Sequence, residues 1–181
     1  MSTRSLIAMQ IEADKYRKIY CHFDGYLTHN GALLLDHYNS PEKVKELIDV
    51  GDISVLAKNL NPDPTRKHGF DYYDRQEDVV VAYGRERGEE NCEAEECTFA
   101  ELDDNIWVDY IYVFTQENKW AYFLPDEAEF INDVETDLNL IYLEKGLSRP
   151  NGYYGFLDEE AIEKFKELNQ TEDVENEMEV G

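Results

Sequence analysis

Two short apolar runs near the start of the chain are separated by a polar turn. Residues 4–11 and 16–23 are rich in apolar side chains, and the polar residues 12–15 lie between them. This arrangement predicts an antiparallel β-hairpin with a four-residue loop. Consecutive leucines within residues 30–38 then predict a short helix.

The residues that follow predict two more helices. Ser40 and Pro41 are typical of an N-cap and of a first helical position, and apolar residues recur three and four apart from there to Gly51. Asp52 predicts the cap of a further short helix, which ends at the Pro-rich residues 61–64. We therefore expect a hairpin followed by three helices in this part of the chain.

Strand patterns return after a polar stretch. Residues 79–83 form a continuous apolar run of the kind found in buried strands. Residues 107–115 and 119–124 are rich in aromatic and β-branched side chains, and residues 116–118 predict the loop of a hairpin between them.

Helical spacing dominates the C-terminal part. Apolar residues recur at helical spacing over 126–145, and Asp158 predicts the cap of a final helix. The chain then becomes acidic with few apolar anchors, which predicts a disordered acidic tail over 169–181. Hairpins rather than βαβ units predict the α+β class, with an antiparallel sheet of about five strands and helices packed on it.

The acidic residues are concentrated after residue 70. The 181 residues include 41 Asp and Glu against 17 Lys and Arg, a net charge of −24. Residues 1–70 hold nine acids and nine bases, so the whole surplus lies in the rest of the chain. We predict a charge-neutral module of hairpin and helices over 1–70, an acidic, aromatic-rich α+β part over 71–168 that belongs to the same domain or forms a second small one, and the tail over 169–181.

Charge runs are usually solvated faces, but here aromatic residues alternate with the acids, as over 107–110 and 71–74. Aromatic rings can hold a charged surface rigid or stack on arginines of a partner. Carboxylates at a density comparable with DNA phosphates, about one per 1.7 Å of duplex axis, can occupy a basic groove built for nucleic acid. The acids predicted to form this partner-binding surface are Glu89, Glu90, Glu93, Glu95, Glu96, Asp103, Asp104, Asp126, Glu127, Glu129 and Asp133.

The densest cluster of reactive side chains is residues 20–26. His22 and Asp24 lie two apart at the end of a predicted strand, so their side chains can share a face. With His29 and His37 close by in the sequence, an acid–base pair or a metal site is an alternative to simple packing. No known metal-ligand spacing is present, so we favour packing and predict no catalytic residue, no metal and no cofactor.

Three cysteines, Cys21, Cys92 and Cys97, predict free thiols in a reducing compartment. Acids around Cys92 and Cys97 disfavour an activated thiolate, and no further Cys or His pair completes a zinc site. The absence of an apolar run of about 18 residues excludes a membrane span, and we expect no secretory signal. The acidic surplus disfavours direct binding to nucleic acid, although the neutral first part of the chain leaves that alternative open.

The N-terminal third resembles a known group of proteins. The similarity lies in Ser-Thr-Arg-Ser-Leu-Ile at 2–7, Tyr-Cys-His-Phe-Asp-Gly-Tyr at 20–26 and scattered positions over 31–54. These residues look like a widespread family of small phage and prophage proteins. The block and the chain length are also similar to a phage anti-CRISPR protein that inhibits type II-A Cas9. Position 8 is more often Gly and position 23 often Trp in that pattern, where this chain has Ala8 and Phe23.

The resemblance implies a counter-defence protein in the cytoplasm of a bacterial host cell, and it brings no catalytic residues with it. Charge and resemblance together predict a protein that is not an enzyme and that inhibits a basic nucleic-acid-binding partner, a Cas9-type nuclease, by mimicking DNA. The alternatives are a small phage enzyme, such as a metal-dependent hydrolase or nuclease that uses His22 and Asp24, or a phage structural protein.

Overall fold

The structure is a computed structural model that describes residues 2–180; the side chains of 171–180 lie outside that description. The strands and helices, in chain order, are β1 (Ser5–Glu12), β2 (Lys15–Cys21), the π-helix η1 (Leu27–Gly31), α1 (Ala32–His37), α2 (Pro41–Val50), β3 (Ile53–Val55), the 3₁₀ helix η2 (Tyr72–Asp74), β4 (Val81–Ala82), α3 (Tyr83–Arg87), β5 (Glu95–Cys97), α4 (Phe99–Asp103), β6 (Tyr110–Phe114), β7 (Trp120–Phe123), β8 (Asn132–Asp133), α5 (Val134–Glu144) and α6 (Glu159–Val180).

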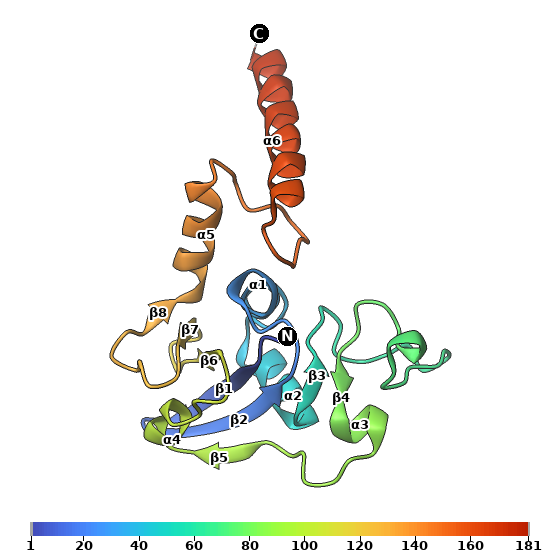
Figure 1. Cartoon of the computed structure of the whole chain (residues 1–181), viewed down its shortest axis with the longest axis vertical. Helices are drawn as coiled ribbons and strands as arrows, with labels where there is room; N and C mark the ends of the chain where they lie inside the picture. Colours follow the sequence, from blue (N-terminus) through green and yellow to red (C-terminus); the bar gives the residue numbers. More distant parts are fainter. Residues whose placement is uncertain (1, 181) are drawn as a thin grey trace.

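A central mixed sheet organises the molecule (Figure 1). Its strand order is β4-β3-β2-β1-β6-β7-β8, and β5 pairs with the beginning of β2. β1 and β2 form the predicted antiparallel hairpin, with Leu6 opposite Tyr20. β1 also pairs in parallel with β6, so strands from both sides of residue 70 share one sheet.

The α+β class is confirmed, but the antiparallel sheet of about five strands is wrong. The sheet has eight strands, and the pairings β1–β6 and β2–β3 are parallel. The alternation of side chains along a strand shows that it has a buried face, but it does not record which neighbour the strand acquires. The strand predicted over 79–83 is present as the shorter β4, whereas the short strands β5 and β8 leave almost no pattern in the sequence.

The helix predicted after Asp52 is the strand β3. Cys21 at the end of β2 pairs with Ile53, and the amide of Phe23 donates to the carbonyl oxygen of Ser54 at 3.1 Å. Ile53 is β-branched and fully buried, which suits a strand that has a neighbour on each side in the sheet. The open edge of β2 supplies the hydrogen-bond partners that outweigh the helical spacing of the apolar residues.

The helix predicted after Ser40 is confirmed. The Ser40 side chain accepts a hydrogen bond from the Lys43 amide at 3.3 Å, and Pro41 occupies the first helical position of α2. The helix ends at Gly51, where φ is +85°. A Cβ atom at this position would lie 2.3 Å from the carbonyl oxygen of Cys92, so both conformation and space require glycine.

The C-terminal helices differ in part from the prediction. The helix expected over 126–145 is shorter, because 126–133 forms turns and β8 before α5 begins. The final helix begins after Asp158 as predicted, and the Ala161 amide donates to the Asp158 carboxylate at 2.8 Å. The predicted disordered tail, 169–181, consists mostly of residues whose side chains the structure does not describe.

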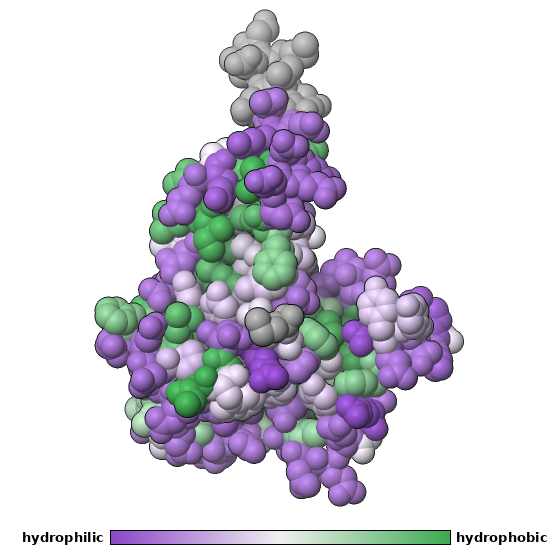
Figure 2. Space-filling model, in the orientation of Figure 1, coloured by the Kyte–Doolittle hydropathy of each residue, from purple (hydrophilic) through white to green (hydrophobic). Residues whose placement is uncertain are grey.

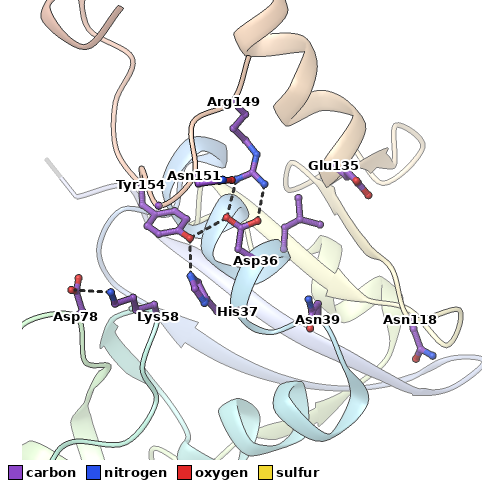
Figure 3. Close-up of a pocket in the computed structure, with 12 residues that line it drawn as sticks. Asp36, His37, Asn39, Lys58, Asp78, Asn118, Glu135, Arg149, Asn151 and Tyr154 are labelled. Carbon is purple, nitrogen blue, oxygen red and sulfur yellow. Dashed lines mark hydrogen bonds and ion pairs between the residues drawn. The ribbon is translucent and has the colours of Figure 1, made fainter. Parts of the chain in front are cut away.

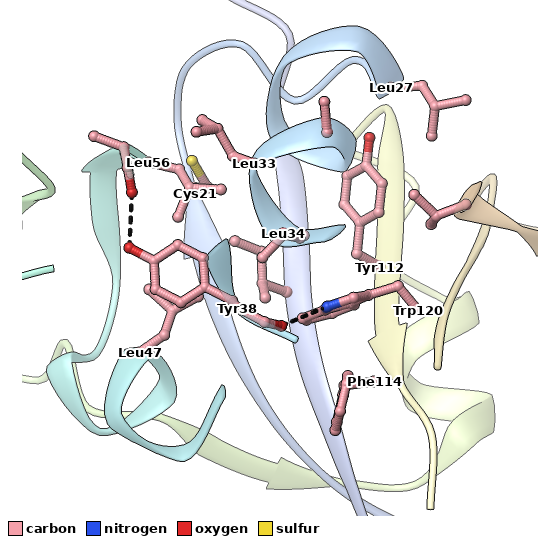
Figure 4. Packing of buried hydrophobic residues seen from close by; sticks show 14 of the residues in the cluster. Cys21, Leu27, Leu33, Leu34, Tyr38, Leu47, Leu56, Tyr112, Phe114 and Trp120 are labelled. Atoms are coloured by element: carbon pink, nitrogen blue, oxygen red, sulfur yellow. Dashed lines mark hydrogen bonds between the residues drawn. The ribbon is translucent and has the colours of Figure 1, made fainter. Parts of the chain in front are cut away.

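Two hydrophobic clusters cover the two faces of the sheet. The larger packs α1, α2 and α5 against one face, and Figure 4 shows Tyr38 and Trp120 within it. Trp120 Nε1 donates to the Tyr38 carbonyl oxygen and the Tyr38 hydroxyl donates to the Ala57 carbonyl oxygen, both at 2.7 Å. The smaller cluster lies on the opposite face and includes Leu102 of α4 and Phe123 of β7. This second cluster anchors the acidic stretch that contains α4.

Candidate functional site

The predicted partner-binding acids lie in two segments. Figure 1 places the loop after α3, then β5 and α4, along the lower margin of the molecule, and the loop between β7 and β8 at its left side. The first segment, 89–104, carries seven of the predicted acids and the second, 126–133, carries four. We refer to these two segments together as the acidic rim.

A backbone contact joins the two segments of the acidic rim. The amide of Asp126 donates to the carbonyl oxygen of Asp103 at 3.0 Å. Beneath this contact the rings of Phe99 and Phe123 lie 5.1 Å apart, and Leu102 is fully buried. Packing of α4 on β7 therefore brings together acids that are far apart in the sequence.

Most of these carboxylates face solvent. Asp103 is half-buried, and its Oδ1 is buried without a hydrogen-bond partner among the described residues; the other ten predicted acids are exposed. Asp133 caps α5 by accepting from the Thr136 amide at 3.0 Å, so it serves the fold. Three of the acids pair with bases, namely Glu96 with Lys15 at 3.5 Å, Glu95 with Lys18 at 3.6 Å and Glu89 with Arg87 at 3.3 Å.

The remaining exposed acids among those predicted, apart from the cap residue Asp133, have no ion pair within the part of the chain that the structure describes. They are Glu90, Glu93, Asp104, Asp126, Glu127 and Glu129. Carboxylates without internal cations remain free to pair with the cations of another molecule.

A small recess and an exposed hydrophobic area adjoin the rim. The recess, about 150 Å³ in volume, is lined by Tyr20, Asp52, Glu95 and Trp107 among others. Figure 2 shows a small hydrophobic area close to α4 on a mostly hydrophilic face. The residues directly after α4 include Ile106 and Trp107, which are 77% and 50% exposed.

The sequence did not predict this recess, because its lining residues come from five separate parts of the chain. The sequence pattern predicts a helix cap at Asp52 and places Tyr20 in the cluster of reactive side chains over 20–26. One signal was present: Lys18 and Tyr20 are two apart on β2, so they share a face of the sheet.

His22 and Asp24 do not form a pair. His22 Nδ1 shares a 2.7 Å hydrogen bond with the Tyr20 hydroxyl, whereas Asp24 lies 3.9 Å from Nε2 of His29. Burial, together with the charge of Arg4, lowers the pKa of His22. Within the described residues no group of three or more His, Cys, Asp or Glu side chains could hold a metal ion.

The three thiols are free, as the sequence predicts. Burial raises the pKa of Cys97 to about 11. Burial and the charges of Asp52 and Glu89 raise the pKa of Cys92. Neither sulfur is therefore an activated nucleophile at neutral pH.

A larger recess of about 800 Å³ lies between α1 and the link that precedes α6 (Figure 3). Arg149 donates to both carboxylate oxygens of Asp36, at 2.7 and 2.9 Å. The Tyr154 hydroxyl donates to Asp36 at 3.0 Å and lies 2.7 Å from Nε2 of His37. These groups are hydrogen-bonded to one another, so the network attaches the link that precedes α6 to α1. His37 does not meet His22 or the other predicted reactive residues there.

Comparison of the chain with protein-family models, with curated proteins and with solved structures finds no match. The resemblance of residues 2–60 to phage proteins therefore stays a prediction. Among the described residues, no helix combines the length and the apolar character needed to cross a membrane.

Proposed function

We propose that the chain is a binding protein whose acidic rim occupies the basic groove of a nucleic-acid-handling protein and so keeps nucleic acid out. The observation that carries this proposal is that two distant segments form one margin of exposed acids, and that six of the predicted acids there have no ion pair among the described residues. Arginine and lysine bind carboxylates through the same charge-assisted hydrogen bonds with which they bind phosphates.

The resemblance of residues 2–60 to phage and prophage proteins directs the proposal to a Cas9-type nuclease. Such a nuclease holds its guide–target duplex in a positively charged channel. The chain would then act as a counter-defence protein in the cytoplasm of the bacterial host. Because the attraction is electrostatic, binding is fast and weakens as salt is added.

The alternative of an enzyme that uses His22 and Asp24 has less support, because each of these side chains contacts a different partner. The alternative of a virion structural protein predicts self-association. Measurement of the molecular mass in solution distinguishes that role from a monomeric inhibitor.

The test measures how the purified chain affects binding of labelled target DNA by a guide-loaded Cas9-type nuclease at several salt concentrations. The double variant Glu93→Lys with Glu127→Lys reverses one charge in each segment of the rim. We expect it to weaken inhibition about tenfold or more, which corresponds to about 1.4 kcal/mol. The control Glu46→Lys with Glu144→Lys makes the same charge change at exposed positions of α2 and α5 and is expected to inhibit nearly as well as the unmodified chain.

Equal loss of inhibition in the two double variants would show that only net charge matters and would contradict a role for the rim. Failure of the unmodified chain to inhibit at low salt would reject the nuclease as its partner.

A further inference from the structure

The recess beside the acidic rim has the size of a side-chain pocket. It measures about 150 Å³ and is lined by Tyr20 of β2, Asp52 before β3, Glu95 of β5, Trp107 after α4 and the buried Leu6 of β1. Small-molecule sites usually measure about 300–1,000 Å³. A recess this small holds roughly five water molecules at about 30 Å³ each, which suits one side chain from a partner.

Two aromatic rings form walls of the recess and are held in place by the fold. The ring centroids of Tyr20 and Trp107 lie 5.1 Å apart at an angle of 45°. Trp107 Nε1 donates to Asn105 Oδ1 at 3.0 Å, and Asn105 Nδ2 donates to the Glu101 carbonyl oxygen of α4 at 2.7 Å. These hydrogen bonds hold the half-exposed Trp107 ring in position before a partner arrives.

One of the carboxylates that line the recess has no ion pair among the described residues. Lys18 is the one cation among the lining residues, and its ammonium lies 3.6 Å from Glu95. Asp52 accepts the Tyr20 amide at 2.9 Å and has no ion pair among the described residues. Burial, reinforced by the charge of Glu95, raises the pKa of Asp52. An added cation would relieve the cost of this half-buried carboxylate.

We propose that the recess receives an arginine side chain from a basic segment of the partner protein. The guanidinium plane stacks against Trp107 and Tyr20 while its N–H groups donate to Asp52 and Glu95. Arginine fits better than lysine because its flat, forked cation both stacks on rings and bonds two acceptors at once. This inference rests on the proposed function, since it takes the partner to be basic, and it adds an aromatic anchor to the charged surface.

Other occupants fit the recess less well. A phosphate would meet the Asp52 and Glu95 carboxylates and be repelled. An apolar side chain would strip water from the same carboxylates without offering a hydrogen bond. Charge complementarity therefore selects a cationic side chain.

The test uses the full chain and two peptides of equal length, one of arginine and one of lysine, with affinity measured by calorimetry. We expect the arginine peptide to bind at least about fivefold more tightly than the lysine peptide. Trp107→Leu and Asp52→Asn are each expected to remove this preference. The matched controls Tyr73→Leu, at a ring that is 95% exposed, and Asp71→Asn are expected to keep it, since neither residue lines the recess.

Trp107 fluorescence gives a second readout, because the other tryptophan, Trp120, is only 3% exposed. Equal affinity for the two peptides, or a preference that survives in Trp107→Leu, would overturn the proposal. Self-association that Trp107→Leu abolishes would assign the recess to a second copy of the chain and would also overturn it. Another outcome is that the unmodified chain shows no preference for arginine while the Glu93→Lys, Glu127→Lys variant loses nuclease inhibition. That result would support the proposed function of the acidic rim and reject the arginine site in the recess.

Discussion

The pKa of a partly buried carboxylate in this chain depends on whether a cation forms an ion pair with it. Burial alone would raise the pKa of Asp36, but the hydrogen bonds and charge of Arg149 lower it overall. Asp52 is also partly buried and lacks such a partner, so its pKa is raised. Asp36 therefore stabilises the fold in its ionised form, whereas ionised Asp52 is costly unless another molecule supplies a cation.

The Asp36 network gives a pH-dependent prediction. Because its folded pKa lies below the ordinary value of 3.8, its contribution to stability is present above that value and is lost as pH falls through the lowered pKa. We expect Asp36→Asn to reduce the free energy of unfolding by about 1–3 kcal/mol at neutral pH. Urea unfolding of both proteins measures the difference, which should shrink in acid. A difference that stays constant down to low pH would refute the ionic origin.

At the scale of elements, the turn from α2 into β3 supports the acidic rim. Gly51 adopts φ +85° and ψ −161°, a region open essentially to glycine alone. The next amide, that of Asp52, donates to the Cys92 carbonyl oxygen at 2.7 Å. The loop that carries Glu90 and Glu93 therefore docks on the end of α2.

We expect Gly51→Ala to destabilise the protein by about 2–4 kcal/mol and to weaken inhibition, because the new methyl group meets the Cys92 carbonyl oxygen. The control is Gly146→Ala, where φ is +71° and nothing lies within 4 Å of the added Cβ. We expect Gly146→Ala to reduce the free energy of unfolding by about 1 kcal/mol. Denaturant unfolding compares the two variants, and equal costs would show that the close approach to Cys92 is unimportant.

At the scale of the whole molecule, the dominant property is the net charge of −24. Two hydrophobic clusters hold the sheet together against the mutual repulsion of these acids. The same charge that destabilises the isolated chain would attract a basic partner. Salt should therefore act on stability and on binding in opposite directions.

We expect the melting temperature to rise when sodium chloride is increased from about 0.01 M to about 1 M, since the screening length falls from about 30 Å to about 3 Å. Binding to the partner should weaken over the same range. Scanning calorimetry measures the first effect, and the Glu93→Lys, Glu127→Lys variant, with its smaller net charge, should show a smaller rise. A melting temperature that falls with salt would contradict the repulsion argument.

Much of the fold could be predicted locally, but little of the candidate site could. The hairpin of β1 and β2, the hairpin of β6 and β7 and the caps at Ser40 and Asp158 follow from short-range patterns. The strand at Ile53 was missed, because pairing with β2 overrides its helical spacing. The recess was missed, because no local pattern records that Tyr20 and Trp107 meet.

The sequence alone determined which segments are strands or helices where caps, turns and periodicity agree, and it determined that the acids follow residue 70. Those properties depend on neighbours within a few residues. Only the tertiary structure decided that β1 pairs with β6, that Asp103 meets Asp126 and that Asp52, beside two aromatic rings, has no ion pair among the described residues. Such contacts depend on how distant segments bury apolar area and satisfy backbone hydrogen bonds together, and a one-dimensional pattern does not contain that information.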